Sequence, residues 1–508
     1  MRPISIAIPS LLLALSAGAS LPARAALFTP GDLVVSTSTY QDTGAVASLM
    51  PGQTLPGGGT AVAGGSNLNV FFNATPDGSF GVTSPIELNE YQGGVLTPVL
   101  ALPTTSAFND GGIVTSFSSK SELSLNLSQN GQYLTLMGYA APVGALDVSN
   151  SGTPGAPEPG NPVNAYINSL TSPLNGVYRE VAEINANGQV TLTQTNAFSG
   201  NNGRAAILAN NGVIYMVGNA GNGNGSVGVT YGAGLQYTTP GAPPIASITA
   251  ADNTQVAKFV ASDNSPKDNN FRGIAIDGNY IFVDKGSGSK GINSVYQVGN
   301  GSALPTGNGN PIVIPNGFPT TLNKDNPSPL YPFGLFFANP DTLYIGDEGP
   351  GTQTSDATAG LEKWSLVGGT WKLDYTLQAG LGIGGSPYDV ADYGDVYTEG
   401  LRDITGKVNS NGTVTIYGVT STYSNISDGM GNTIDSGADP NELVSITDSL
   451  GATTLPGSEM FDVLAGPVYG TVYRGVAFAP TVPEPASVLL LACGLTGLCV
   501  VRRKRRTC

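Results

Sequence analysis

The stretch Arg272-Gly-Ile-Ala-Ile-Asp-Gly278-Asn-Tyr-Ile-Phe-Val283 decides the fold of this 508-residue chain. Apolar residues alternate with small or polar ones before the dipeptide Asp277-Gly278, and a second strand-forming run follows it. Alternation with a period of two predicts a half-buried strand. Asp-Gly tolerates the positive φ that a tight turn between antiparallel strands needs. The stretch therefore predicts a β-hairpin.

The same pattern recurs along the chain, at intervals of 61 to 72 residues between position 204 and position 474. Each copy has an Arg or a Phe, a small or polar residue, alternating apolar positions, a turn and a second strand. The copies begin at Arg204, Arg272, Phe333 and Arg402, and an earlier copy begins at Glu122. A second hairpin is predicted at 86–100, 177–195, 235–248, 294–304, 361–377 and 443–455. Two hairpins per repeat make a four-stranded antiparallel sheet, which is a propeller blade.

The two ends of the repeated region indicate how the ring closes. Residues 473–479 supply the first strand of a repeat without a second, and residues 31–36 supply a strand that fits the gap. Their pairing would leave no open sheet edge. We predict an all-β chain with a single β-propeller of six blades. Seven blades are the alternative because the first two repeats are long, and a β-helix or two stacked sandwiches are the competing folds.

Composition limits the chemistry of the chain. It contains no histidine, and its three cysteines, Cys493, Cys499 and Cys508, all lie near the C-terminus. This excludes His-dependent catalytic triads and imidazole acid–base catalysis, and it disfavours zinc and copper sites in the central part. The net charge of −15 makes nucleic acid a poor partner.

The N-terminal segment, residues 1–25, has the pattern of a secretory signal peptide. A short basic start precedes a mostly apolar run, and Ala23-Arg24-Ala25 is an A-x-A cleavage pattern. The mature propeller domain is therefore expected to comprise residues 26–481, after cleavage by signal peptidase.

Residues 482–508 form a tail with three parts. Pro483-Glu484-Pro485 disfavours helix, the apolar run 488–501 is shorter than a comfortable membrane span, and 502–506 are all cationic. This order resembles the PEP-CTERM sorting signal of Gram-negative bacteria. The resemblance implies a short hydrophobic transmembrane helix, removal of the tail by an exosortase, and delivery to the cell surface or the extracellular polysaccharide. A plain tail-anchor helix is the alternative. The membrane would be a partner only through this segment.

Four repeated arginines are the first candidate for a binding site. Arg204, Arg272, Arg402 and Arg474 would open the innermost strands and gather at one mouth of the central channel. Asp284, Asp347 and Glu348 leave the second strands toward the same face. One interpretation is that arginine–carboxylate pairs between blades lock the ring. The other is a site for an anion or sugar acid, bound by bidentate guanidinium contacts.

A second, less specific candidate is a Gly-rich loop with Asp428, Asn432, Asp435 and Asp439. Oxygen-rich loops suit Ca²⁺, although this spacing is not that of an EF-hand. The alternative is an acidic loop exposed to solvent. Ca²⁺ is the only cofactor that the sequence suggests.

Two functions of different class fit these features. The first is a non-enzymatic surface or matrix protein that binds polysaccharide or another surface protein. The second is a Ca²⁺-dependent hydrolase or lyase acting on an extracellular ester, lactone or acidic glycan. Without histidine, Asp, Glu, Tyr or Arg would have to act as acid and base, and no catalytic residue is assigned. Converging oxygen ligands at the channel mouth would favour the enzyme, and arginine–carboxylate pairs would favour the binding protein.

Overall fold

A computed structural model describes residues 26–40, 82–145, 148–154, 176–219, 234–244, 270–286, 291–306, 310–351, 356–391, 393–427, 433–434 and 438–482. Within these ranges the chain forms β-strands and two short 3-10 turns, Val148–Asn150 and Asn323–Asp325. No helix there has the length and apolar character that a membrane crossing requires. The predicted signal peptide with Ala23 and Ala25, the motif Pro483-Glu484-Pro485 and the hydrophobic segment 488–501 lie outside the described residues.

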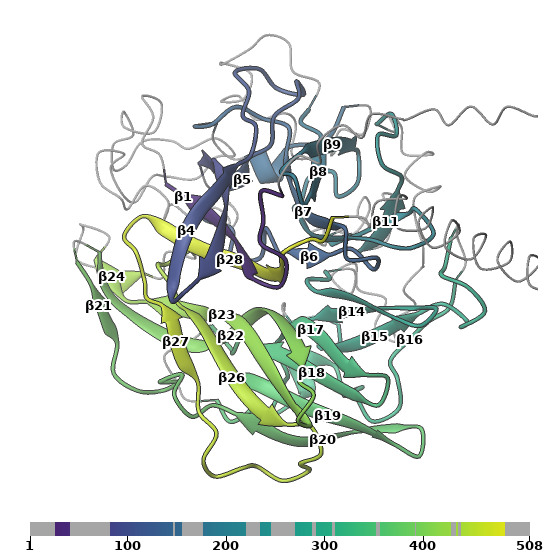
Figure 1. The fold of residues 1–508 in the computed structure, drawn as a ribbon, viewed down its shortest axis with the longest axis vertical. Coiled ribbons are helices and arrows are strands. Elements are labelled where there is room, and N and C mark those ends of the chain that lie inside the picture. The colour runs from purple at the N-terminus through teal and green to yellow at the C-terminus, as the bar shows by residue number, and fades with distance from the viewer. Residues whose placement is uncertain are drawn as a thin grey trace, which may run out of the picture.

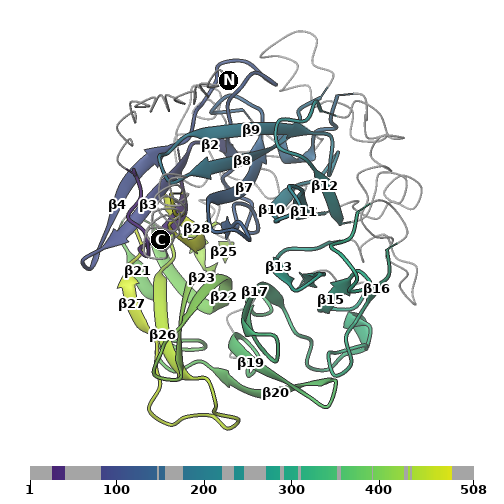
Figure 2. The ribbon, with the colours of Figure 1, turned by 45° about the vertical axis from the view of Figure 1, so that its right-hand side comes forward.

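Six sheets stand around a common centre, so the all-β propeller with six blades is confirmed (Figures 1 and 2). Blade 1 contains β28 (Thr471–Phe478), β1 (Leu33–Thr39), β3 (Ile86–Gln92) and β4 (Val95–Ala101). Blade 2 contains β6 (Asn126–Leu127), β7 (Tyr133–Tyr139), β8 (Arg179–Asn185) and β9 (Val190–Thr195). Blade 3 contains β10 (Gly203–Leu208), β11 (Ile214–Gly218) and β12 (Leu235–Thr238).

The remaining blades complete the ring. Blade 4 contains β13 (Ile274–Asp277), β14 (Tyr280–Lys285), β15 (Ser294–Val298) and β16 (Ile312–Val313). Blade 5 contains β17 (Pro332–Asn339), β18 (Thr342–Asp347), β19 (Gly360–Val367) and β20 (Thr370–Leu377). Blade 6 contains β22 (Gly394–Val408), β23 (Thr413–Ser424), β26 (Leu443–Ser449) and β27 (Asp462–Ala465), with β21 (Tyr388–Val390) beside β22. Two small ladders lie outside the blades: β2 (Thr83–Ser84) with β5 (Thr115–Ser116), and β24 (Ile426–Ser427) with β25 (Thr433–Ile434).

The hairpin predicted around Asp277-Gly278 is formed by β13 and β14. Their register runs from Ile274 opposite Val283 to Asp277 opposite Tyr280. Gly278 has a φ of 56°, in the left-handed region that the turn requires. The local pattern of the repeat was therefore sufficient to predict this element.

Ring closure follows the prediction as well. β1 pairs antiparallel with β28, from Leu33 opposite Phe478 to Thr39 opposite Thr471. On its other side β1 pairs with β3. The first described strand therefore lies inside blade 1, between the last strand and the rest of the blade.

Two outer strands differ from the predicted positions. The hairpin predicted within 294–304 keeps only β15, because β16 is formed later, at Ile312–Val313. Gly299 and Gly301 both have positive φ and turn the chain aside, and Asn279 Nδ2 donates to Gly301 O at 3.0 Å. In blade 6 the outer strand is β27 rather than a strand ending at 455. In blade 3, part of the predicted second hairpin, residues 245–248, lies outside the described residues.

The blades pack through apolar side chains that alternate along their strands. An apolar cluster lies between each pair of neighbouring blades around the ring, including blades 6 and 1. Between blades 1 and 2, for example, Val34, Leu134 and Ile184 are completely buried. Burial of such a side chain contributes about 1.5–3 kcal/mol, and no disulfide contributes, because the described residues contain no cysteine.

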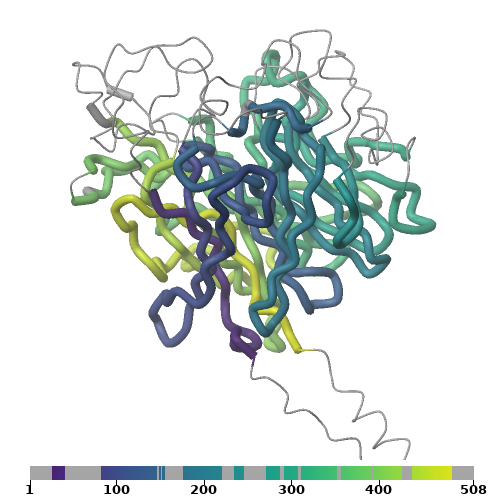
Figure 3. Tube along the Cα trace, turned by 90° about the horizontal axis from the view of Figure 1, so that it is seen from above, coloured from purple at the N-terminus to yellow at the C-terminus, as the bar shows by residue number. Residues whose placement is uncertain are grey.

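The two faces of the ring have different features. The tight hairpin turns lie on one face, and the described chain ends pack there: Leu27 N donates to Ala186 O at 2.8 Å and Thr481 N to Gly131 O at 2.8 Å. Figure 3 shows the first and last described segments, purple and yellow, leading to the same side. β14 and β18 end on the opposite face, at Lys285 and Asp347. We call that side the mouth face.

Candidate functional site

The first residue of each repeat forms an inner ring at the channel, one side chain per blade. In blade order the inner ring is Arg474, Glu122, Arg204, Arg272, Phe333 and Arg402, and all six are buried. A glycine directly after three of these residues, Arg272, Phe333 and Arg474, allows the neighbouring blade to approach. A Cβ on Gly273 would lie 2.3 Å from Phe333 O, and one on Gly334 would lie 2.5 Å from Arg402 O. The repeat therefore brings the four predicted arginines to one place.

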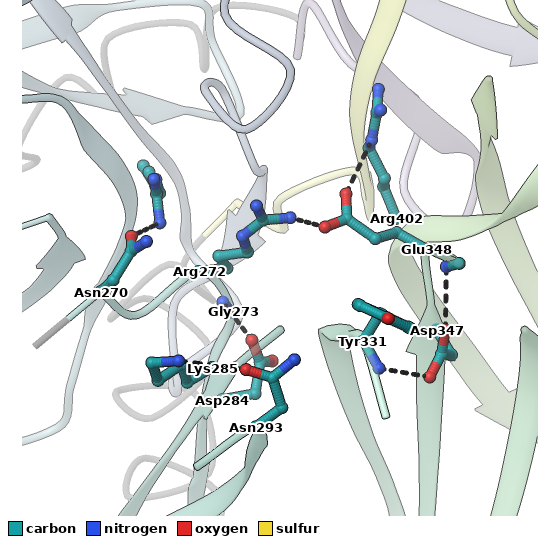
Figure 4. Close-up of polar contacts among 12 residues, drawn as sticks. Asn270, Arg272, Gly273, Asp284, Lys285, Asn293, Tyr331, Asp347, Glu348 and Arg402 are labelled. Atoms are coloured by element: carbon teal, nitrogen blue, oxygen red, sulfur yellow. Dashed lines mark hydrogen bonds and ion pairs between the residues drawn. The ribbon is translucent and has the colours of Figure 1, made fainter. Parts of the chain in front are cut away.

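Arg272 and Arg402 share one carboxylate, Glu348 (Figure 4). Arg272 Nη1 forms an ion pair with Glu348 Oε1, and Arg402 Nε lies 3.3 Å from Oε2. The Glu348 side chain is 10% exposed, and those of Arg272 and Arg402 are 10% and 5% exposed. Because the three residues come from blades 5, 4 and 6, Glu348 connects three neighbouring blades. The predicted arginine–carboxylate pairing between blades is present here.

The other two arginines of the inner ring bind neutral oxygens. Arg204 Nη1 donates to Asn270 Oδ1 and to Phe271 O, the latter at 3.1 Å. Arg474 Nε donates to Ser38 Oγ at 2.9 Å, and its two terminal nitrogens donate to the carbonyls of 117 and 119. Burial lowers the pKa of Arg204 to about 10 and that of Arg474 to about 9, and the charge of Glu122 opposes both shifts. Both guanidiniums therefore stay cationic at neutral pH.

Asp284 and Asp347, predicted as partners of the arginines, make their hydrogen bonds to the backbone. Asp284 Oδ1 accepts from Gly273 N at 3.1 Å. Asp347 accepts from Tyr331 N at 2.7 Å and from Gly349 N at 2.9 Å. Burial raises the pKa of each carboxyl to about 7. Arg272 and Arg204 attract Asp284 only through their charge, which opposes that rise.

Two further buried charged residues, Arg179 and Asp403, were not predicted from the sequence. Arg179, completely buried, donates from Nε to Asn201 O at 2.8 Å and from Nη1 to Val177 O at 2.9 Å. Asp403 accepts from Ser124 Oγ at 2.8 Å, from the backbone N–H of 125 at 3.1 Å and from that of 476 at 2.9 Å. Burial raises the pKa of Asp403 to about 7. The position of Asp403 directly after a repeat arginine could have indicated it as a candidate. Arg179 lies outside the repeat motif, and no sequence pattern indicated it.

A pocket of about 210 Å³ opens beside Glu348 on the mouth face. Its charged and hydroxyl-bearing side chains include Lys120, Arg272, Arg402, Glu348, Glu399 and Ser421, and the segment 349–351 completes one wall. Three cations and two carboxylates give these side chains one net positive charge, whereas the whole chain carries −15. The pocket is therefore locally positive, although the chain as a whole is negative.

Arg272 is a cation of the pocket whose pKa lies well below its ordinary value. Burial lowers its pKa, and the charges of Arg204 and Arg402 lower it further. Glu348 provides the compensating negative charge through its ion pair with Arg272 Nη1. An anionic ligand would have to share this cation with Glu348.

The predicted Ca²⁺ loop is described only in part. Asp439 is buried, and its Oδ1 accepts from Tyr393 Oη at 2.6 Å. Asp428, Asn432 and Asp435 lie outside the described residues. Within the described ranges, no group of three His, Cys, Asp or Glu side chains could hold a metal ion.

A polar cluster outside the channel ties blade 5 to blade 6. Lys363 Nζ lies 3.0 Å from Asp448 Oδ2, and both side chains are fully buried. Tyr375 Oη donates to Asp448 Oδ1 at 2.7 Å, and Tyr344 Oη donates to Oδ2. Burial raises the pKa of Asp448, but these hydrogen bonds and one with Glu459 outweigh that effect and lower it. Because the pair is sealed from solvent, we assign it to blade packing.

Comparisons with known proteins add little. No protein-family model matches the sequence, and no curated protein matches it. Among solved structures, a glucose dehydrogenase is 13% identical with a TM-score of 0.34, over 68% of this chain and 91% of that one. The GH74 enzyme of Niastella koreensis is 14% identical with a TM-score of 0.33, over 79% and 50%. A quinoprotein alcohol dehydrogenase-like protein of Bacteroides thetaiotaomicron is 8% identical with a TM-score of 0.30, over 78% and 85%. At these values the likenesses assign no activity to this chain.

Proposed function

We propose that the chain is an exported protein of the cell surface or extracellular matrix, and that its propeller is a non-enzymatic binding module. Its partner would be the extracellular polysaccharide or another surface protein. Export and sorting rest on the signal-peptide pattern and on the tail that resembles PEP-CTERM signals. Signal peptidase and exosortase would be its processing partners.

The observation that carries the binding function is the Arg272–Glu348–Arg402 arrangement at the pocket. A Ca²⁺ enzyme would need several oxygen ligands that converge without a competing cation. Here Glu348, one of the two carboxylates of the pocket, is already engaged by two guanidiniums. The charges therefore favour recognition of an anionic partner over coordination of a cation.

The position of the pocket agrees with attachment at the C-terminal end of the propeller. The last described residues pack against the hairpin turns, whereas the pocket lies on the mouth face. A propeller held at its C-terminal end would present its mouth face away from the point of attachment. The pocket would then be accessible to polymer or to a neighbouring surface protein.

Co-sedimentation tests the proposed function. Residues 26–482 contain every described strand and close the ring, so they are suitable as an isolated domain. We expect this domain to co-sediment with the producing organism's extracellular polysaccharide, with Ca²⁺ or with a chelator. The double variant Arg272→Gln and Arg402→Gln should lose binding. The matched control, Lys372→Gln with Lys407→Gln, removes the same charge at exposed positions and should bind normally.

Two outcomes contradict the proposal. Failure of the folded wild-type domain to bind the polysaccharide or any surface protein of the organism would exclude it. Turnover of an ester, lactone or acidic glycan that stops with chelator would instead support the Ca²⁺-dependent enzyme.

Sorting is tested separately by mass spectrometry of the native protein. A chain starting at Ala26 and lacking the tail is expected, and a membrane-bound chain that retains Cys508 would support the plain tail anchor.

A further inference from the structure

The pocket lining combines two kinds of recognition. Lys120, Arg272 and Arg402 supply positive charge, but Glu348 and Glu399 lie in the same wall. A site for a bare inorganic anion has no use for carboxylates, because they repel it. Ionised carboxylates only accept hydrogen bonds, so they suit a ligand that carries hydroxyl donors. The lining therefore fits a ligand with both a negative charge and hydroxyl groups.

The size of the pocket restricts that ligand to one small unit. Its volume is about 210 Å³. Pockets for drug-sized ligands have about 300–1,000 Å³. The space suits a single sugar residue, and a longer chain would extend from the pocket across the mouth face.

Two buried polar groups in the lining have unused hydrogen-bonding capacity. The hydroxyl of Ser421, a residue that is only 1% exposed, has no hydrogen-bond partner among the described residues. The same holds for Nε of Arg272. Buried polar groups without partners are costly and uncommon in native proteins. A bound ligand with an acceptor for Arg272 and a hydroxyl for Ser421 would satisfy both.

We propose that the pocket binds one carboxylated sugar unit of the uronate type. The ligand carboxylate lies between Arg272 and Lys120, and the sugar hydroxyls bond to Glu399 and Ser421. Glu348 stays paired with Arg402 and keeps the net charge of the pocket low enough to prefer a single negative charge. The assignment rests on the proposed binding function and specifies its ligand class.

Isothermal titration calorimetry with residues 26–482 tests this ligand class. The probes are D-glucuronate, D-glucose and acetate, which carry both groups, only the hydroxyls and only the carboxylate. We expect glucuronate to bind at least about tenfold more tightly than either of the other two, because a hydrogen bond to a charged group accounts for about one decade or more. Arg272→Gln should weaken glucuronate binding by a similar factor.

Ser421→Ala separates recognition from folding. Removing a buried hydroxyl that has no partner should leave the thermal unfolding temperature unchanged or higher. It should nevertheless weaken glucuronate binding several-fold. The exposed-site variant Lys372→Gln serves as the control and should bind as the wild type does.

The outcomes distinguish this inference from the proposed function. If the polysaccharide co-sediments in an arginine-dependent way but glucuronate does not bind, the uronate assignment is wrong and the binding function stands. Acetate or glucose binding as tightly as glucuronate also overturns the assignment. Glucuronate binding unaffected by Ser421→Ala and Arg272→Gln would place the sugar elsewhere. Absence of polysaccharide and surface-protein binding removes the proposed function itself.

Discussion

At the scale of single residues, Glu348 has the largest electrostatic role at the mouth. Its two oxygens face guanidiniums from two different blades. Without it, Arg272 and Arg402 would repel each other in a site where little water screens them. The carboxylate therefore connects the ring and sets the charge of the pocket at the same time.

Glu348→Gln should lower the free energy of unfolding by about 3–5 kcal/mol, because it leaves two buried cations without their compensating charge. Urea denaturation followed by circular dichroism measures the change. The control is Asp325→Asn, an exposed carboxylate whose removal should change little. A loss of less than about 1 kcal/mol in the Glu348 variant would mean that other groups stabilise the two arginines.

Asp284 gives the ring a pH dependence of defined sign. Burial raises its pKa to about 7 in the folded chain, against about 3.9 in an unfolded one. The folded state therefore binds the proton more tightly, and the stability from this group is complete below pH 4 and lost as the pH rises through 7. The loss should not exceed about 1.4 kcal/mol per pH unit for this one proton.

Asp284→Asn should flatten the decline in stability between pH 4 and pH 7. The measurement is the free energy of unfolding of both proteins at several pH values in that range. Asp347 and Asp403, whose pKa values burial also raises to about 7, leave a residual slope in the variant. Equal slopes in wild type and variant would show that Asp284 is ionised throughout, held by the charges of Arg272 and Arg204.

At the scale of elements, close contact between neighbouring inner strands depends on glycines, which carry no side chain. Gly475 lies in β28, and a Cβ there would be 2.3 Å from Leu125 N and 2.6 Å from Leu123 O. These are backbone atoms of blade 2, which cannot move aside as a flexible side chain would. The glycine therefore allows β28 to lie against the start of the next blade.

Gly475→Ala should destabilise the propeller by about 1–3 kcal/mol or more, the usual cost of forcing extra atoms into a packed site. Gly451→Ala is the matched control, because a Cβ there meets nothing within 4 Å and its φ is not positive. Thermal unfolding of both variants measures the difference. Equal stabilities would mean that β28 can move away from blade 2 without loss.

The sequence predicts local elements better than distant contacts. The turn at Gly278 and the pairing of β1 with β28 depend on nearby residue types and on the repeat count, so both could be predicted. The outer strands β16 and β27 could not, because a loop of variable length separates each from its partner strand. Likewise Lys120, Glu399 and Ser421 meet in the pocket only after three parts of the chain fold together. Of the candidate site, the repeat therefore indicated the arginines and Glu348 but not the remaining wall.

At the scale of the whole molecule, the ring depends on β1. It pairs with β28 on one side and β3 on the other, so it joins the two ends of the described chain within one sheet. Ala479 N also donates to Asp32 O at 2.8 Å beside that pairing. Removing β1 would expose two unpaired strand edges and the apolar side chains that face blade 6.

Deletion of residues 26–40 should therefore abolish cooperative unfolding and promote aggregation, whereas a circular permutant should not. In the permutant a short flexible linker joins residue 482 to residue 26, and the new ends lie between 456 and 457, in an exposed loop. Because the permutant keeps the β1–β28 pairing, we expect its free energy of unfolding to stay within about 1 kcal/mol of the wild type. Guanidinium titration and size-exclusion chromatography measure both proteins.

If the permutant fails as the deletion does, chain order rather than strand pairing closes the ring. If the deletion unfolds cooperatively at wild-type stability, β1 is dispensable, and the propeller is stable with an incomplete blade 1.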